Sequence, residues 1–124
     1  MDDAQRNQRK LLRFLEDIVE YGEAAREPLA TSSLERFVTD GDIRHLVYYR
    51  VQCVSEAVKN VLALDPEIAS RAPEIPWARV KTIGNVFRHE YGNVAAAVIW
   101  RTVTGKDLPA LIAVARRELE RLNA

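Results

Sequence analysis

The sequence holds little of what metal sites and disulfide scaffolds require. Cys53 is the only cysteine, so the chain can form neither an internal disulfide nor a zinc site built from several cysteines. The two histidines, His45 and His89, lack the spacing of a metal-ligand motif. We therefore expect a protein that works without a metal and without another cofactor.

Long apolar runs and an excess of charge of one sign are also missing. No stretch approaches the ~20 apolar residues of a membrane-spanning helix, and charges interrupt residues 1–22, where a signal peptide would be apolar. The 18 basic residues balance 18 acidic ones, so no overall field attracts nucleic acid or an anionic membrane. We expect a cytoplasmic protein that does not bind membranes, and any nucleic-acid site must be local.

Helical periodicity, by contrast, runs along nearly the whole chain. Of the 124 residues, 48% are hydrophobic, which is enough for one core, and no alternating strand pattern interrupts them. The sequence predicts a single all-α domain over residues 1–124, a compact bundle of four to five main helices with shorter ones. Apolar residues recur at three- and four-residue steps in the segments 11–22, 34–38, 43–62, 77–91, 94–104 and 107–122.

Capping residues and helix breakers predict where these helices begin and end. The residues expected at helix starts are Ser33, Asp40 or Asp42, Pro76, Asn93 and Asp107. The residues expected at helix ends are Gly22, Gly92 and Gly105. Three prolines lie between residues 66 and 76, so this segment is predicted to connect two helices through one short helix.

The segment GNVFRHEYGNV at 84–94 places polar residues at the end of the predicted helix 77–91. Lys81, Asn85 and His89 follow one another at four-residue steps and therefore share one stripe of a helix, with Arg88 beside His89. The lysine, the amide and the imidazole are thus predicted to lie on the same face of the helix. From the residues alone two interpretations stay open: a functional cluster, or a polar helix face on which His89 carries no chemistry.

Other polar and aromatic residues have structural explanations. Trp77 and Trp100 are expected in the core or at an interface rather than as platforms for stacking bases. His45 is expected to be half-buried, and Glu56 to form a buried ion pair with Arg50 or with a partner chain.

Three segments resemble, in order and spacing, the HepT-like branch of the HEPN superfamily: RVQCVSEAVKNVL at 50–62, PEIPWARVKTIGNVFRHEYGNV at 73–94 and IWRTVTGKDLPAL at 99–111. The resemblance implies a HEPN-type up-and-down helical bundle that forms a homodimer. It also implies a metal-independent ribonuclease, the toxin of a type VII HEPN/MNT toxin–antitoxin system. The implied partners are a second copy, an RNA substrate and a minimal nucleotidyltransferase antitoxin.

The signature of that family is an arginine, four to six further residues and a histidine, commonly followed two residues later by a tyrosine. In this chain the histidine is His89, the tyrosine is Tyr91, and the polar residue that follows the arginine is Asn85. Gly84 stands in place of the arginine, and the two residues before it supply none. The resemblance implies catalysis by His89 with Asn85, and attachment of AMP to Tyr91 by the antitoxin. Ser55, where the family often has glycine, implies altered helix packing.

The chemistry explains why the missing arginine matters. Metal-free RNA cleavage needs a base of near-neutral pKa, which histidine provides, and a fixed positive charge that stabilises the phosphorane. Lys81 and Arg88 are the candidate RNA-binding cations that replace the arginine. Two alternatives remain: a catalytically degenerate HEPN protein that binds the nucleotidyltransferase or RNA, and a structural dimer. We expect the helix 77–91, with Trp77, Phe87 and Tyr91, in the dimer interface.

Overall fold

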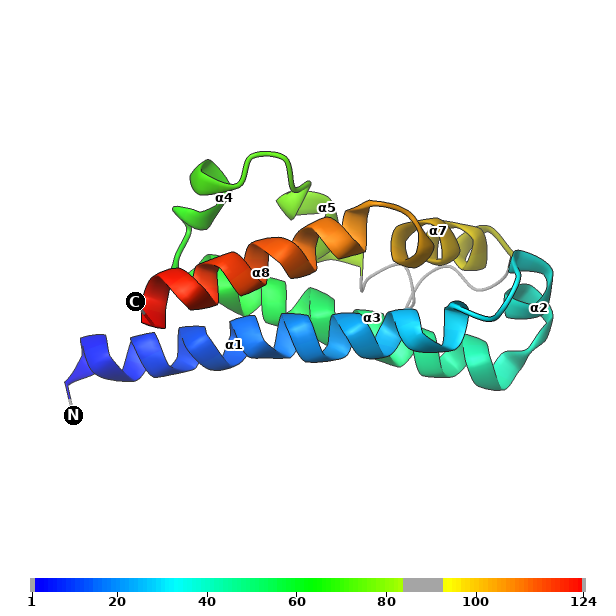
Figure 1. Ribbon diagram of the computed structural model, residues 1–124, viewed down its shortest axis with the longest axis horizontal. Coiled ribbons are helices and arrows are strands. Elements are labelled where there is room, and N and C mark those ends of the chain that lie inside the picture. Colours follow the sequence, from blue (N-terminus) through cyan, green and yellow to red (C-terminus); the bar gives the residue numbers. More distant parts are fainter. Residues whose placement is uncertain (1, 84–92, 124) are drawn as a thin grey trace.

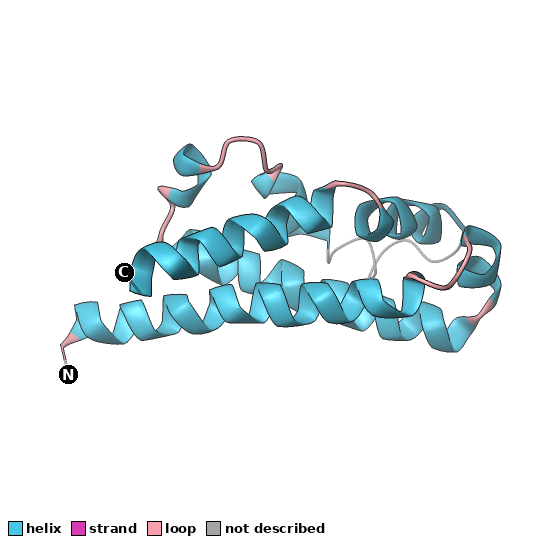
Figure 2. Ribbon diagram, viewed as in Figure 1, coloured by secondary structure: helices cyan, strands magenta, loops and turns pink. Residues whose placement is uncertain are grey.

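The computed structural model describes residues 2–83 and 93–123, and all secondary structure in these ranges is helical (Figure 2). The predicted all-α class is confirmed. Two long antiparallel helices, α1 (Asp3–Arg26) and α3 (Gly41–Leu64), pack along each other, and α8 (Asp107–Asn123) packs against α1 (Figure 1). The shorter elements are η1 (Glu27–Leu29), α2 (Leu34–Thr39), α4 (Ile68–Arg71), α5 (Trp77–Thr82) and α7 (Asn93–Thr104).

Helix α1 forms because an apolar stripe of Leu11, Leu15 and Ile18 faces the other helices. The predicted end near Gly22 is wrong, since the helix continues to Arg26. Gly22 instead lies where α8 crosses closest: a Cβ on it would stand 2.9 Å from Cγ1 of Ile112. The glycine therefore serves helix packing and does not end the helix.

The predicted helix caps are only partly right. The hydroxyl of Ser33 accepts a hydrogen bond from the N–H of Arg36 at 3.1 Å, and the Asp40 carboxylate accepts two from the first turn of α3. Asp40, not Asp42, is thus the cap of α3. Asp107 is the first residue inside α8, and its carboxylate accepts from Arg79 at 2.8 Å.

Gly105 follows the last residue of α7, as predicted. Its N–H donates to the carbonyl oxygen of Arg101 at 2.9 Å, and a Cβ at this position would lie 2.5 Å from the same oxygen. A side chain here would push the chain away from the end of the helix. The connection from α7 to α8 can therefore be short only because residue 105 is glycine.

The core lies where α1, α3, α7 and α8 meet. Phe37 is fully buried, with its ring centroid 5.8 Å from that of Trp100 and 6.1 Å from that of Tyr48. Leu46, predicted on the apolar face of α3, is 42% exposed. The largest fully buried side chains are Phe37, Leu15, Ile18, Ile68, Ile99, Val47, Val58, Val61 and Val103.

One buried carboxylate ties α4 to α8. The side chain of Glu118 is only 3% exposed and accepts hydrogen bonds from Arg71 and Arg121, both through Nε at 3.1 and 3.2 Å. Arg71 also pairs with Asp65 at the end of α3. Two guanidinium groups and excellent hydrogen-bond geometry are what a buried carboxylate requires to remain charged.

None of the helices in the described part of the chain combines the length and the apolar character of a membrane-spanning helix.

Candidate functional site

Of the five predicted site residues, Lys81 alone lies within the described part of the chain. It is exposed in the last turn of α5. Asn85, Arg88, His89 and Tyr91 lie outside the described residues. The signature segment, residues 84–92, follows directly after α5 and Ile83, so these elements form its described surroundings in the chain.

A buried hydroxyl anchors α5 to α3 immediately before that segment. The Oγ of Ser55 lies 2.9 Å from the carbonyl oxygen of Val80 and 3.0 Å from that of Lys81. Ser55 is only 4% exposed, so its hydroxyl has little access to water and donates to these carbonyls. A glycine at this position would allow close packing of the two helices, whereas the serine joins them by a hydrogen bond. This hydrogen bond holds the backbone of Lys81 on α3.

The beginning of α5 is fixed by the indole of Trp77. The ring is buried, and its Nε1–H donates to the carbonyl oxygen of Ala72 at 2.8 Å. Trp100 is half-buried and packs against the core. The structural explanation of both tryptophans is therefore confirmed, and neither is needed for stacking bases.

A cleft of about 500 Å³ opens between α5, α7 and the start of α8. Ile83, the last described residue before the signature segment, forms part of its wall. The charged residues on the wall are Arg79, Arg101 and Asp107. Arg79 is paired with Asp107, whereas Arg101 is exposed and makes no ion pair with any residue that the structure describes.

Arg101 is therefore an exposed cation on the wall of the cleft that Ile83 also lines. A guanidinium group matches phosphate geometry and stays charged at every physiological pH. Spacing in the sequence does not identify Arg101, because it lies 17 residues beyond Gly84 and only the fold brings it into one cleft with Ile83. The available signal was its place in the family-like segment IWRTVTGKDLPAL.

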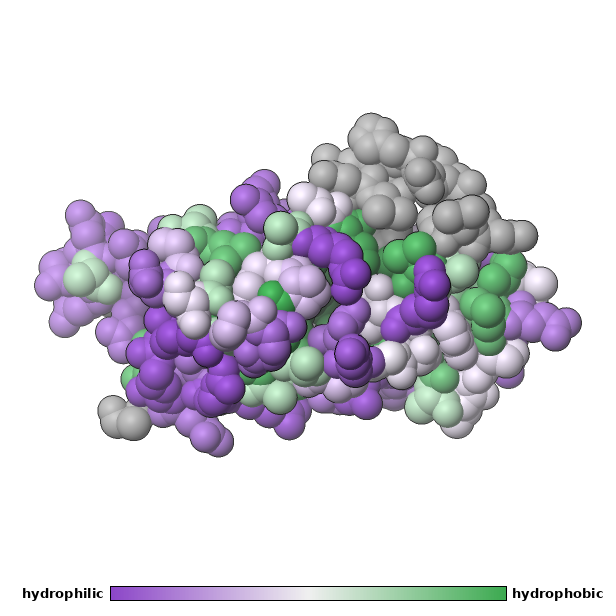
Figure 3. Space-filling model, turned by 90° about the horizontal axis from the view of Figure 1, so that it is seen from above, coloured by the Kyte–Doolittle hydropathy of each residue, from purple (hydrophilic) through white to green (hydrophobic). Residues whose placement is uncertain are grey.

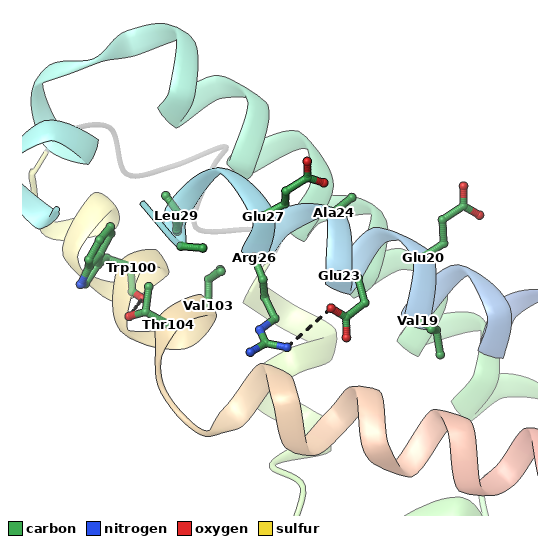
Figure 4. A pocket seen from close by; sticks show the side chains of 11 residues that line it. Val19, Glu20, Glu23, Ala24, Arg26, Glu27, Leu29, Trp100, Val103 and Thr104 are labelled. Carbon is green, nitrogen blue, oxygen red and sulfur yellow. Dashed lines mark hydrogen bonds and ion pairs between the residues drawn. The ribbon is translucent and has the colours of Figure 1, made fainter. Parts of the chain in front are cut away.

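A larger groove of about 900 Å³ lies between the end of α1, η1 and the end of α7 (Figure 4). Its floor is apolar, with Leu29, Val103 and Trp100 among the lining residues. Three glutamates of this region line it with a single arginine, Arg26, which pairs with Glu23 at 3.6 Å (Figure 4). The net charge of the lining is negative, so the groove repels phosphate and is not the place for RNA.

Two further expectations are wrong for the single chain. His45 is exposed on α3 and not half-buried. Glu56 is also exposed, and the guanidinium of Arg50 donates to the carbonyl oxygen of Ala24 at 2.6 Å, so these two residues form no ion pair. A pair between Glu56 and a partner chain stays a prediction.

Comparison with known proteins identifies the family of the chain. Residues 11–118 match the Ribonuclease HepT-like family. A protein of Thermococcus cleftensis named "Probable ribonuclease HepT" is 32% identical over 79% of this chain and 86% of its own length. A "Putative RNase" of Caldanaerobacter subterraneus subsp. tengcongensis is 30% identical over 79% of this chain and 84% of its own. No solved structure gives a significant match.

The chain therefore belongs to the HepT-like ribonuclease family, whose members are HEPN-type all-α proteins.

Proposed function

We propose that this protein is a metal-independent endoribonuclease in which His89 is the general base. Membership of the HepT-like family and the retained residues His89, Asn85 and Tyr91 of its signature support this activity. The observation that carries the proposal beyond the family match is the cleft with Arg101 next to the start of the signature segment. Arg101 supplies a positive charge in a chain whose signature has lost its arginine at Gly84.

In the proposed reaction His89 takes the proton of the ribose 2′-hydroxyl, and the freed oxygen attacks the adjacent phosphorus. The bond from phosphorus to the 5′-oxygen breaks, and this oxygen takes up a proton from the imidazolium of His89 or from water. The products are a 2′,3′-cyclic phosphate and a 5′-hydroxyl. The amide of Asn85 orients the phosphate, and cationic side chains stabilise the negative charge of the phosphorane.

The cations come from two sources. Lys81 lies in α5 and Arg88 in the signature segment, and Arg101 of α7 lines the cleft at the end of α5. If two copies face each other through residues 77–91, each cleft collects these charges from both chains. The homodimer is therefore part of the proposed active site and not merely a packing arrangement.

The proposed cellular role is that of the toxin in a type VII HEPN/MNT system. A minimal nucleotidyltransferase would silence the toxin by attaching AMP to Tyr91, because each added phosphodiester brings bulk and negative charge to the place of the RNA phosphate. The reaction and its control both take place in the cytoplasm. Neither requires a cofactor bound to this chain.

The test is cleavage of a single-stranded RNA in the presence of a chelator. Wild-type protein should release fragments that end in a 2′,3′-cyclic phosphate, and His89→Ala should lose ~10² to 10⁴ of the rate. His45→Ala is the matched control, since this exposed histidine lies on α3 and should leave the rate unchanged. Equal rates for His89→Ala and wild type would contradict the proposal.

A second function is favoured by Gly84. Without the signature arginine the protein could bind RNA or the nucleotidyltransferase and leave RNA intact. This catalytically degenerate module would bind RNA in a way that depends on Lys81 and Arg101. Binding without cleavage in the same experiment would identify it.

A further inference from the structure

The charge on the outer face of α1 changes sign only once along the helix. The basic residues come first and the acidic residues follow, at alternating steps of three and four positions, which places them on one stripe of the helix. The stripe lies opposite the buried residues of α1 as far as Glu20, whereas Glu23 at its end is half-buried and pairs with Arg116 of α8. Its members are Arg6, Arg9, Arg13, Glu16, Glu20 and Glu23.

This stripe is antisymmetric about its centre, between residues 14 and 15. Arg13 corresponds to Glu16, and the same reflection relates Arg9 to Glu20. It also relates Arg6 to Glu23, so the two residue numbers add up to 29 in all three pairs. If two such helices lie antiparallel about a two-fold axis at this centre, every pair joins opposite charges.

Within one chain the two ends of the pattern are paired: Arg6 lies 3.2 Å from Asp3, and Glu23 lies 3.6 Å from Arg26 and 3.6 Å from Arg116 of α8. In its middle, Arg9, Glu16 and Glu20 make no ion pair among the described residues. Arg9 and Arg13 are four positions apart, as are Glu16 and Glu20, and like charges at this spacing destabilise a helix. The helix dipole does not explain the pattern either, because it acts on the first and last turns only.

The beginning of α1 extends beyond the rest of the bundle. All residues from 2 to 10 are exposed, and the helix begins beyond the C-terminal end of α8 (Figure 1). Seen from above, this end of the molecule is covered mainly by hydrophilic side chains (Figure 3). In the acidic half, the side chain of Glu20 points away from α8, whereas that of Glu23 points toward α8 (Figure 4).

We propose that a second copy of this chain docks along the outer face of α1, antiparallel, with the basic half of each helix on the acidic half of the other. Nucleic acid and anionic membranes fit only one half of the stripe, whereas a second copy matches both halves. The contact is separate from the interface through residues 77–91. In Figure 1 helix α1 forms the lower edge of the molecule, and α5 lies on the upper side.

Two double variants test this contact. Glu16→Arg with Glu20→Arg makes the four central positions of the stripe basic, and Arg9→Glu with Arg13→Glu makes the same four positions acidic. Each variant alone should associate more weakly through α1, with a dissociation constant raised by roughly tenfold or more, because like charges now face each other. A mixture of the two should associate again, and so should the quadruple variant with all four charges exchanged. Sedimentation velocity at low ionic strength measures the association, and circular dichroism checks that each variant is helical.

The control for net charge is Glu35→Arg with Glu56→Arg, which changes two exposed glutamates away from α1 by the same total charge. It should associate like the wild type. Wild-type association at low salt that both α1 double variants retain in full would overturn the proposal, as would a wild type that shows no α1 contact in the cross-linking experiment below.

Orientation is tested by disulfide formation in a Cys53→Ala background. Chains with Arg9→Cys mixed with chains with Glu20→Cys should cross-link to each other under mild oxidation. Chains with Arg9→Cys alone should not, since antiparallel packing separates the two sulfurs by about 16 Å along the helix axis. Cross-links between two copies of residue 9, or none in the mixture, would contradict antiparallel docking. No RNA enters these experiments, so their outcome is independent of the ribonuclease activity.

Discussion

The hydroxyl of Ser55 on α3 lies 2.9 Å from the carbonyl oxygen of Val80 in the last turn of α5. With the second hydrogen bond of the same hydroxyl, to the carbonyl oxygen of Lys81 at 3.0 Å, it joins α5 to α3 just before the signature segment. It joins two positions that are 25 residues apart in the chain. The orientation of α5, and with it that of Lys81, therefore depends on a residue outside the signature.

Replacing Ser55 with alanine should lower the free energy of unfolding by about 1 kcal/mol, because a buried hydrogen bond is removed. Urea unfolding followed by circular dichroism measures the change. The matched control is Ser70→Ala, which removes an exposed hydroxyl from α4 and should change stability by less than about 0.5 kcal/mol. Equal stability of Ser55→Ala and Ser70→Ala would show that the hydrogen bond contributes nothing.

The sequence predicts the helices well because their apolar stripes and several of their caps are local signals. Ser33, Asp40 and Gly105 act within one turn of the residues that they terminate, so their roles follow from the residues nearby. The prediction at Gly22 is wrong because the residue type alone does not distinguish a glycine that allows close helix packing from a glycine that ends a helix. Which of these it is depends on Ile112, 90 positions further along.

The candidate site is harder to predict from the sequence, because it too depends on residues that are distant in the chain. The family signature identifies His89, Asn85 and Tyr91 by spacing, and these assignments stay predictions. Arg101 has no spacing rule that connects it to them. Only the fold places Arg101 of α7 in one cleft with Arg79 and Thr82 of α5.

The buried Glu118 should make stability depend on acidic pH. Burial raises the pKa of this carboxyl, but hydrogen bonds from Arg71 and Arg121 outweigh burial, and the pKa is lowered. A lowered pKa in the folded state means that the stabilisation is complete above the pKa of the unfolded chain, about 4.3. It is lost as the pH falls through the still lower pKa of the folded state.

Glu118→Gln should therefore cost about 2 kcal/mol at neutral pH and reduce the further loss of stability below about pH 4. Urea unfolding at several pH values measures both effects. Glu120→Gln is the control, since Glu120 is exposed on the same helix. A pH dependence that is the same in Glu118→Gln and wild type would contradict the assignment.

Arg101 should contribute to RNA affinity. Arg101→Ala should weaken binding of single-stranded RNA at low salt and lower the slope of log affinity against log salt by about 0.7 for each RNA phosphate that the arginine neutralises. Arg36→Ala removes an exposed arginine of α2 and is the control with the same change of charge. If both variants lose the same affinity, the effect comes from net charge and the cleft has no special role.

Restoring the signature arginine should increase ribonuclease activity. In Gly84→Arg the guanidinium would return to the position from which the family signature supplies it, and the rate should rise by ~10² to 10³. Gly84→Lys offers the same charge without the planar geometry and should recover less. A rate that does not change in Gly84→Arg would mean that other cations already do this work, and Gly84→Arg combined with Arg101→Ala would then separate the two sources.

Tyr91 should be the residue that a cognate nucleotidyltransferase modifies. Tyr91 stands two residues after His89 and two residues before Asn93, where α7 begins, so we expect its hydroxyl at an accessible position beside the RNA site. Incubation with that enzyme and ATP should add one or more AMP units, which intact-mass spectrometry detects. Tyr91→Phe should gain none, whereas Tyr49→Phe, which lacks the hydroxyl of a tyrosine that is 60% exposed on α3, should be modified like the wild type. Equal mass gains in Tyr91→Phe and wild type would place the modification elsewhere, and the protein would then be better explained as a binding module.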